Sequence, residues 1–127
     1  NKFLKKRRKV VKIYNDLFAN NQYLVTPFVS KEAQHAYHLY SVQINFNKIK
    51  INKKDLFTEF LKRGIKLQVH YIPIHLQPFY KKKYGFKRGD FPNSEKFYSQ
   101  QVSLPIYYSI KNHEIHKVAN LINQFVK

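Results

Sequence analysis

The chain of 127 residues contains no cysteine, no methionine and no tryptophan, and it has only three glycines. The lack of cysteine excludes a disulfide framework and a thiolate metal site. Three glycines are too few for a glycine-rich loop that binds phosphate. A translated chain ordinarily starts with methionine, whereas this sequence starts with Asn1. We therefore expect a fragment or a processed product.

Acidic residues are also scarce: 7 Asp and Glu stand against 24 Lys and Arg, for a formal net charge of +17. Scattered carboxylates argue against a catalytic carboxylate pair. The excess positive charge favours phosphates or acidic surfaces as partners and says nothing about fold. No apolar run approaches the roughly 20 residues of a membrane span, and no signal-peptide pattern is present. These absences predict a cytoplasmic protein without membrane contact.

Hydrophobic residues make up 43% of the chain and aromatic residues 17%, which is enough to build a core. The length fits a single domain over residues 1–127. Periodicity predicts helices over 3–18, between the caps Asn52 and Gly64, and over 77–84, 93–100 and 112–126. Strands are predicted over 39–46, 65–71 and 102–105. This order predicts a small α/β sandwich with helices on one face of a short sheet.

The first predicted helix is strongly basic, with the run KKRRK at residues 5–9. Such a run either contacts phosphate or forms a solvated helix face. The solvated face is favoured because the lysines lie opposite the apolar stripe. Arg7 is different, since it projects into that stripe. It either pairs with a carboxylate or an anionic ligand, or lays its aliphatic stem along the surface.

Two histidines, His35 and His38, flank Tyr37. Their spacing of three would suit a pair of metal ligands on a helix. No third ligand is apparent and cysteine is absent, so no metal site is predicted. His113 and His116 lie outside the apolar stripe of the last helix and are expected to be exposed.

The stretch VHYIPIHLQPFY, residues 69–80, concentrates groups that can bond, stack and exchange protons. His70 is predicted at the end of a strand, either as a ligand contact or as a buried histidine bonded to the backbone. Strand alternation places Tyr71 on the opposite, apolar face, so Tyr71 is expected to be half core unless the chain bends. No nucleophile–base motif occurs, and no catalytic residue is predicted.

Three segments together carry a resemblance: HAYHLYSV at 35–42, KRGIKLQVHYIPIHLQPFY at 62–80, and DFPNSEKFYSQQVSLPIY at 90–107. They resemble the C-terminal part of the pyridoxal phosphate-dependent sugar aminotransferases, the DegT/StrS family. Within it they look most like UDP-sugar 4-aminotransferases of the pseudaminic acid type. The resemblance implies the C-terminal small domain of a fold type I enzyme, with a largely antiparallel sheet.

The resemblance also implies function. Such enzymes are homodimers that transfer an amino group from glutamate to a 4-keto-6-deoxy sugar nucleotide. Pyridoxal phosphate is expected in the full-length enzyme and not on this fragment, which lacks the large domain and the Schiff-base lysine. The alternatives are a dehydratase of the same family and a basic nucleic-acid-binding domain. The latter is disfavoured because most aromatics fall on apolar stripes.

By the same resemblance, the substrate-binding residues are His70, Tyr71 and His75, through hydrogen bonds to the sugar or diphosphate and through stacking. His35, Tyr37 and His38 match a segment that is structural or lies at the domain interface.

Overall fold

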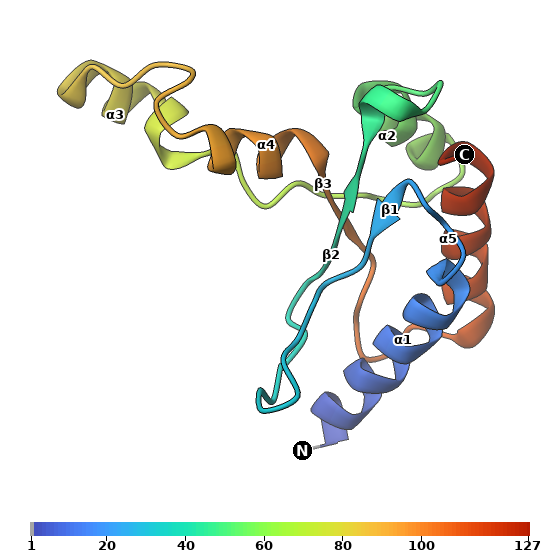
Figure 1. Ribbon diagram of the computed structural model, residues 1–127. Helices are drawn as coiled ribbons and strands as arrows, with labels where there is room; N and C mark the ends of the chain where they lie inside the picture. The colour runs from blue at the N-terminus through green and yellow to red at the C-terminus, as the bar shows by residue number, and fades with distance from the viewer. Residues whose placement is uncertain (1) are drawn as a thin grey trace.

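A three-stranded antiparallel sheet lies at the centre of the computed structural model, which describes residues 2–127 (Figure 1). Its strands are β1 (Leu24–Val25), β2 (Tyr40–Ile44) and β3 (Gln101–Leu104), with β2 in the middle. The register sets Ser41 of β2 opposite Ser103 of β3. The predicted short, largely antiparallel sheet is confirmed.

Three helices pack with the sheet: α1 (Lys2–Phe18), α2 (Lys53–Lys62) and α5 (Asn112–Phe125). Two more, α3 (Pro78–Tyr84) and α4 (Pro92–Gln100), contribute no buried residue to the core, although α4 contacts β2. Short 3₁₀ turns span Phe46–Lys48 and Ile74–Leu76. The five predicted helices are thus all present, with ends within one or two residues of the prediction.

The core follows from the alternation of β2, where Tyr40, Val42 and Ile44 are fully buried. They pack with buried residues of the helices and β3: Val10, Tyr14, Leu56, Phe60, Val102, Leu104, Ile115, Val118 and Ile122. The rings of Tyr14 and Tyr40 stack with centroids 4.9 Å apart. Their hydroxyls donate to Pro105 O at 3.1 Å and to Asn15 Oδ1 at 2.6 Å. Burial raises the pKa of both phenols, so both remain neutral donors.

Both predicted caps of α2 are present. The side chain of Asn52 accepts the Asp55 N–H at 2.9 Å. At the other end, Gly64 N–H donates to Leu61 O at 2.9 Å and Ile65 N–H to Phe60 O at 3.0 Å. This pair of bonds is the Schellman motif, and it requires the left-handed φ of +73° that Gly64 adopts.

Replacing Gly64 by alanine is expected to lower the free energy of unfolding by about 1 kcal/mol, because a Cβ disfavours the left-handed conformation. Nothing lies within 4 Å of the added Cβ, so the cost is conformational rather than steric. Urea unfolding measures it, with Gly64→Asn as the control that tolerates this conformation and loses less. Equal stability of Gly64→Ala and the parent protein would contradict the role of this cap.

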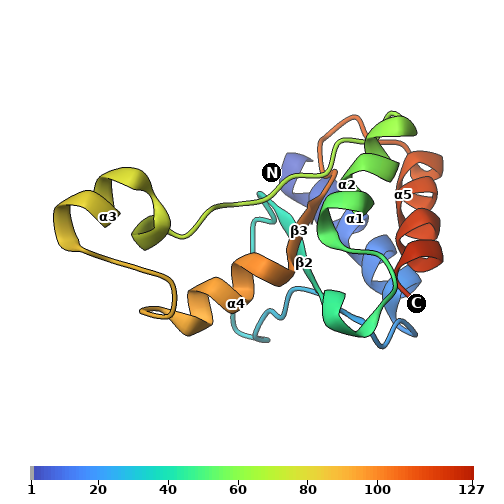
Figure 2. The ribbon, with the colours of Figure 1, turned by 90° about the horizontal axis from the view of Figure 1, so that it is seen from above.

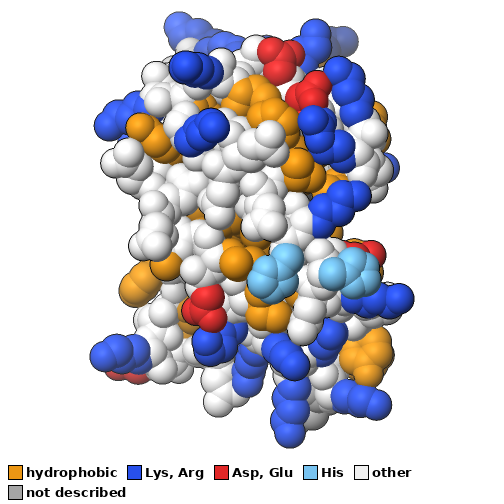
Figure 3. Space-filling model, turned by 90° about the vertical axis from the view of Figure 1, so that its right-hand side faces the viewer, with side chains coloured by type: hydrophobic (Ala, Val, Ile, Leu, Met, Phe, Trp, Pro, Cys, Tyr) orange, Lys and Arg blue, Asp and Glu red, His pale blue; other side chains and the backbone are white. Residues whose placement is uncertain are grey.

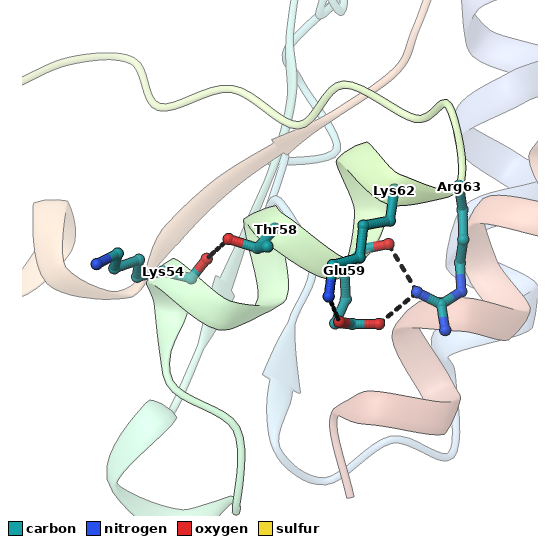
Figure 4. A network of polar contacts seen from close by, with 5 residues as sticks. All are labelled: Lys54, Thr58, Glu59, Lys62 and Arg63. Carbon is teal, nitrogen blue, oxygen red and sulfur yellow. Dashed lines mark hydrogen bonds and ion pairs between the residues drawn. The ribbon is translucent and has the colours of Figure 1, made fainter.

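The exposed face of α2 carries a small ionic cluster (Figure 4). Lys62 Nζ donates to Glu59 Oε1 at 2.8 Å, and Arg63 Nη1 bonds both the carbonyl and the carboxylate of Glu59. These bonds, first that of Lys62 and then that of Arg63, hold the pKa of Glu59 below its ordinary value. Because the cluster lies at the surface, it adds little to stability.

The predicted strand over 65–71 is wrong for most of its length. Only Gln68 pairs, forming an isolated antiparallel bridge to Ser103. The backbone N–H of His70 instead donates to the side chain of Gln101 at 3.0 Å, so the ladder stops before His70. Likewise β1 was missed, because two residues carry no detectable alternation.

Residues 71–100 form an arm that extends away from the sheet, carrying α3 and α4 (Figures 1 and 2). No residue of α3 or α4 is buried. Sequence periodicity predicted both helices, but it did not predict that neither of them would bury a residue. Within residues 2–127 no helix is both long and apolar enough to cross a membrane.

Candidate functional site

His70 lies where the chain leaves the edge of the sheet and enters the arm, and two bonds hold it there. Its ring Nδ1 lies 2.8 Å from Ser103 Oγ, and its backbone N–H donates to Gln101 Oε1 at 3.0 Å. The peptide bond between His70 and Tyr71 is cis. The prediction left open a backbone carbonyl as the partner of the ring, and the partner is a serine hydroxyl instead.

The side chain of Gln101 organises this corner from a fully buried position. Its Nε2 donates to Ser41 Oγ at 2.6 Å and to Ser103 Oγ at 2.7 Å. These residues occupy the polar face of the sheet, opposite the apolar core face. Sequence reasoning missed Gln101 and Ser103. Polar and apolar residues alternate over 101–104, and this pattern indicates only a strand. It does not indicate that Gln101 and Ser103 contact His70.

His70 lines a groove with a volume of about 720 Å³, which lies between α1, α5, the end of β3 and the 64–70 segment. Such a volume suits a small-molecule ligand. Basic and histidine side chains line it: Arg7, Lys66, Lys117, His38, His70 and His113. Among the lining residues Glu114 alone is acidic. The groove is therefore suited to an anionic group such as a diphosphate.

Arg7 settles one of the alternatives left by the sequence. It is half-buried in the groove wall, and no ion pair of residues 2–127 includes it. Pairing with a protein carboxylate is therefore wrong for the described part of the chain. An anionic ligand in the groove remains the chemistry that would match this guanidinium.

The one carboxylate of the groove is already engaged. Glu114 accepts the backbone N–H of Lys111 at 2.7 Å and the Tyr107 hydroxyl at 3.4 Å. The Lys111 bond lowers the pKa of Glu114, and partial burial raises the pKa of Tyr107. Glu114 thus caps the first turn of α5, so its carboxylate does not pair with the basic groups of the groove. Among those groups, Lys117 donates its Nζ to Arg63 O at 3.2 Å.

Tyr71 is not half core, as alternation predicted, because 74% of it is exposed. Its ring meets that of His70 edge to face, with centroids 4.7 Å apart. The two side chains therefore lie together and not on opposite faces. This arrangement is compatible with a shared substrate contact, which stays a prediction for both residues.

His75 lies elsewhere, in the arm, and only 6% of it is exposed. Its Nε2 lies 3.0 Å from Glu95 Oε1, and its ring centroid lies 4.7 Å from that of Phe91. The His75 bond is the first cause of a lowered pKa at Glu95. His75 ties the 3₁₀ turn to α4 and is absent from the lining of the groove. Its predicted contact with the sugar stays a prediction.

Of the other histidines, two line the groove, one lies in a loop, and His116 is exposed on α5 outside the groove, as expected. His35 Nδ1 accepts the backbone N–H of Tyr37 at 2.9 Å, which stabilises the loop before β2. His38 and His113 line the groove, and His113 is also exposed, as expected. Residues 2–127 contain no group of three side chains placed to hold a metal ion.

Exposed aromatic side chains are more numerous than the sequence suggested: Phe3, Phe28, Tyr71, Phe79, Tyr80, Tyr84, Phe91, Phe97, Tyr107 and Tyr108. Ten of the 21 aromatic side chains are thus exposed, so the burial of the aromatics is a weaker argument against nucleic-acid binding than the sequence suggested. On the face shown in Figure 3, Lys and Arg side chains lie in separate groups at the top, the right and the bottom, with uncharged side chains across the centre. Scattered charge of this kind is not the footprint of a nucleic-acid groove.

Lys53 lies in the first turn of α2, and its environment is expected to make the free energy of unfolding depend on pH. Its Nζ donates to Tyr98 O at 2.6 Å and has no carboxylate partner among residues 2–127. Burial lowers its pKa from 10.5 to about 8. Between pH 8 and pH 10.5 the unfolded chain binds more protons at this lysine than the folded chain does. The free energy of unfolding therefore rises with pH in this window. Because Lys53 is only half-buried, we expect a gain of about 1 kcal/mol after screening.

Urea unfolding across this pH window checks the sign, with Lys53→Met as the variant that cannot titrate. The parent protein should gain stability relative to Lys53→Met as pH rises. The exposed neighbour Lys54 is the control, since Lys54→Met should follow the parent curve. Parallel curves for the parent and Lys53→Met would rule the effect out.

The chain is similar in sequence to several known proteins. A protein of unknown function from Methanocaldococcus jannaschii is 43% identical over 122 residues, which cover 96% of this chain and 32% of that protein. A UDP-4-amino-4,6-dideoxy-N-acetyl-beta-L-altrosamine transaminase from Campylobacter jejuni is 33% identical over 104 residues, covering 82% of this chain and 27% of that protein. The chain thus spans about a third of the length of such relatives.

The fold is shared with solved structures. The aminotransferase PseC of Helicobacter pylori, involved in the biosynthesis of pseudaminic acid, superposes with a TM-score of 0.84. That match has 24% identity and covers 97% of this chain and 32% of PseC, so it shows the fold alone. The model of the DegT/DnrJ/EryC1/StrS aminotransferase family matches residues 1–123. The chain therefore belongs to the DegT/DnrJ/EryC1/StrS aminotransferase family.

Proposed function

We propose that this chain is the small domain of a pyridoxal phosphate-dependent aminotransferase that acts on nucleotide sugars. The observation that carries the proposal is the groove beside His70, with its basic lining and its one engaged carboxylate. A nucleotide sugar offers a diphosphate to such a lining and hydroxyls to the histidine. In this proposal Tyr71, exposed beside the His70 ring, adds a stacking surface.

The relatives support the reaction type. The Campylobacter jejuni relative is a transaminase of a UDP-linked amino sugar, and an Aneurinibacillus thermoaerophilus relative is a transaminase of a dTDP-linked one. These names favour amino transfer over dehydration. We infer a 4-keto-6-deoxy sugar nucleotide as the acceptor and glutamate as the amino donor.

The cofactor needs residues that the groove does not supply. Pyridoxal phosphate requires a lysine for its aldehyde and an acid for its pyridine nitrogen. The groove is lined by Lys66 and Lys117, but its only carboxylate, Glu114, is held by Lys111 and Tyr107, so the groove offers no free acid for the pyridine nitrogen. We infer that a large domain, outside this chain, holds it. The chain's own contribution is to bind and orient the sugar.

The arm supports an assembly with that domain, in an enzyme that we propose to be a homodimer. Its exposed apolar side chains include Ile72, Ile74, Phe79, Tyr84 and Phe91. Exposed apolar groups in such number on one projecting segment mark a surface that packs against another protein surface. In this proposal the arm packs against the remainder of the enzyme, and His75 with Glu95 keeps it in shape.

The test is an amino-transfer assay on the longer protein that contains this chain. With pyridoxal phosphate, glutamate and a UDP-linked 4-keto-6-deoxy sugar, we expect an amino sugar and 2-oxoglutarate as products. The 127-residue chain alone should give neither turnover nor the absorbance of a lysine–cofactor adduct. Turnover by the chain alone, or its absence from the longer protein over a panel of keto-sugar nucleotides, would overturn the proposal.

A further inference from the structure

We propose that Gln101 and Ser103 hold the neutral ring of His70 in the tautomer that carries its hydrogen on Nε2. His70 then presents a hydrogen-bond donor to the groove, and the ligand atom that it recognises is an acceptor oxygen. The tautomer follows from the bonds among Gln101, Ser103 and His70. Only the identity of the ligand rests on the function proposed above.

The hydrogen bonds of Gln101 determine which end of its side-chain amide is the oxygen. A backbone N–H can only donate, and that of His70 points to one end of the Gln101 amide at 3.0 Å. That end must therefore be the oxygen. The nitrogen then lies at the other end, where it meets Ser41 Oγ at 2.6 Å and Ser103 Oγ at 2.7 Å. Both amide hydrogens are thus donated to the two serine hydroxyls.

The surroundings of Ser103 determine the direction of the bond between its hydroxyl and His70 Nδ1. Its oxygen accepts a hydrogen from Gln101, and its own hydrogen needs an acceptor because Ser103 is only 4% exposed. Within the described part of the chain, the remaining partner of this hydroxyl is His70 Nδ1, at 2.8 Å. The hydroxyl therefore donates to Nδ1. A ring nitrogen that accepts carries no hydrogen, so the hydrogen of the neutral ring is on Nε2.

The tautomer of His70 determines which ligand atoms the ring can bind in the groove. The contacts of residues 2–127 include no partner for Nε2, and His70 is among the residues that line the groove. The neutral His70 therefore offers one N–H to whatever binds there. A sugar hydroxyl oxygen, a keto oxygen or a phosphate oxygen accepts such a bond, whereas an ammonium group does not. Gln101 and Ser103 act on the ligand through His70 and are positioning residues.

Nitrogen NMR on the 127-residue chain with ¹⁵N-labelled histidine tests the tautomer without any ligand. The spectrum is recorded at about pH 8.5, where an ordinary histidine is neutral. The His70 signals are assigned by their loss in His70→Gln. We expect Nδ1 to resonate as an unprotonated nitrogen and Nε2 as an N–H. A protonated Nδ1 in the neutral ring would overturn the proposal.

Variants of Ser103 supply a second measurement. Ser103→Ala removes the donor to Nδ1, so both tautomers become populated and the two nitrogen signals move toward each other. Ser103→Thr keeps the hydroxyl and should restore the parental positions. Ser99→Ala is the control, because the Ser99 hydroxyl bonds Lys96 O within α4. Unchanged His70 signals in Ser103→Ala would count against the proposal. If Ser103→Ala fails to fold, the spectrum of the parent chain still decides.

Addition of UDP separates this inference from the proposed function. Binding of its phosphate oxygens near the ring should shift the Nε2–H signal and leave Nδ1 unprotonated. A correct tautomer without any response to UDP would count against the nucleotide-sugar groove alone. A wrong tautomer would refute the positioning role whether or not UDP binds.

Discussion

Replacing His70 by alanine is expected to weaken binding of a UDP-linked sugar by about 10- to 100-fold in the protein that contains this chain. The lost bond runs from the ring Nε2 to a charged or polar oxygen of the ligand. Hydrogen bonds to charged groups contribute about 1.5–3 kcal/mol, and each 1.4 kcal/mol is a tenfold change in affinity. Calorimetric titration with the sugar nucleotide measures the change, and kcat/KM should fall by a similar factor.

Two further variants sharpen this result. His116→Ala is the matched control, since His116 is exposed on α5 and does not line the groove. It should bind like the parent protein. His70→Gln can place an amide N–H near the position of Nε2, so it should retain part of the affinity. If His70→Ala bound the sugar nucleotide as tightly as the parent protein, His70 would not be a contact of the ligand.

Replacing Phe60 by alanine is expected to lower the free energy of unfolding by about 3–5 kcal/mol, the largest effect on stability that we predict. The Phe60 side chain is fully buried, and its ring lies 6.3 Å from that of Phe125 on α5. Its loss leaves a cavity where α2 joins the core. Urea unfolding followed by circular dichroism measures the change.

The control for this effect is Phe79→Ala, which removes the same side chain from a site that is 61% exposed. In the isolated chain its effect should stay within about 0.5 kcal/mol. Similar losses for the two variants would mean that α2 does not pack as described. If the Phe60→Ala protein is unfolded in buffer, Phe60→Leu is the milder replacement that still measures the site.

Much of the local structure could be read from the sequence, because its signals lie within a few residues of one another. Asn52 and Gly64 bound α2, since a cap and a left-handed turn depend on short-range bonds. The alternation of Tyr40, Val42 and Ile44 predicted both β2 and its buried face. The family followed from three motifs, and the comparisons confirm it.

The candidate site was only partly readable. His70 was singled out correctly as lying where the chain leaves the sheet, yet its partners Gln101 and Ser103 are 31 and 33 residues away. No local pattern links them. Tyr71 was misplaced because strand alternation was carried to a residue that has left the ladder. His75 looked like a twin of His70, and its bond to Glu95, 20 residues on, places it in the arm.

The sequence by itself determined the helices, the central strand, the basic charge and the family, because periodicity, caps and motifs are local properties of the chain. Only the tertiary structure decided which polar groups meet. It gathered Arg7, His38, His70 and Lys117 around one groove and left α3 and α4 without a buried residue. The physical reason is that burial and hydrogen bonding depend on which residues become neighbours after packing. Gln101 reads as an ordinary strand residue until packing places His70 and Ser103 beside it.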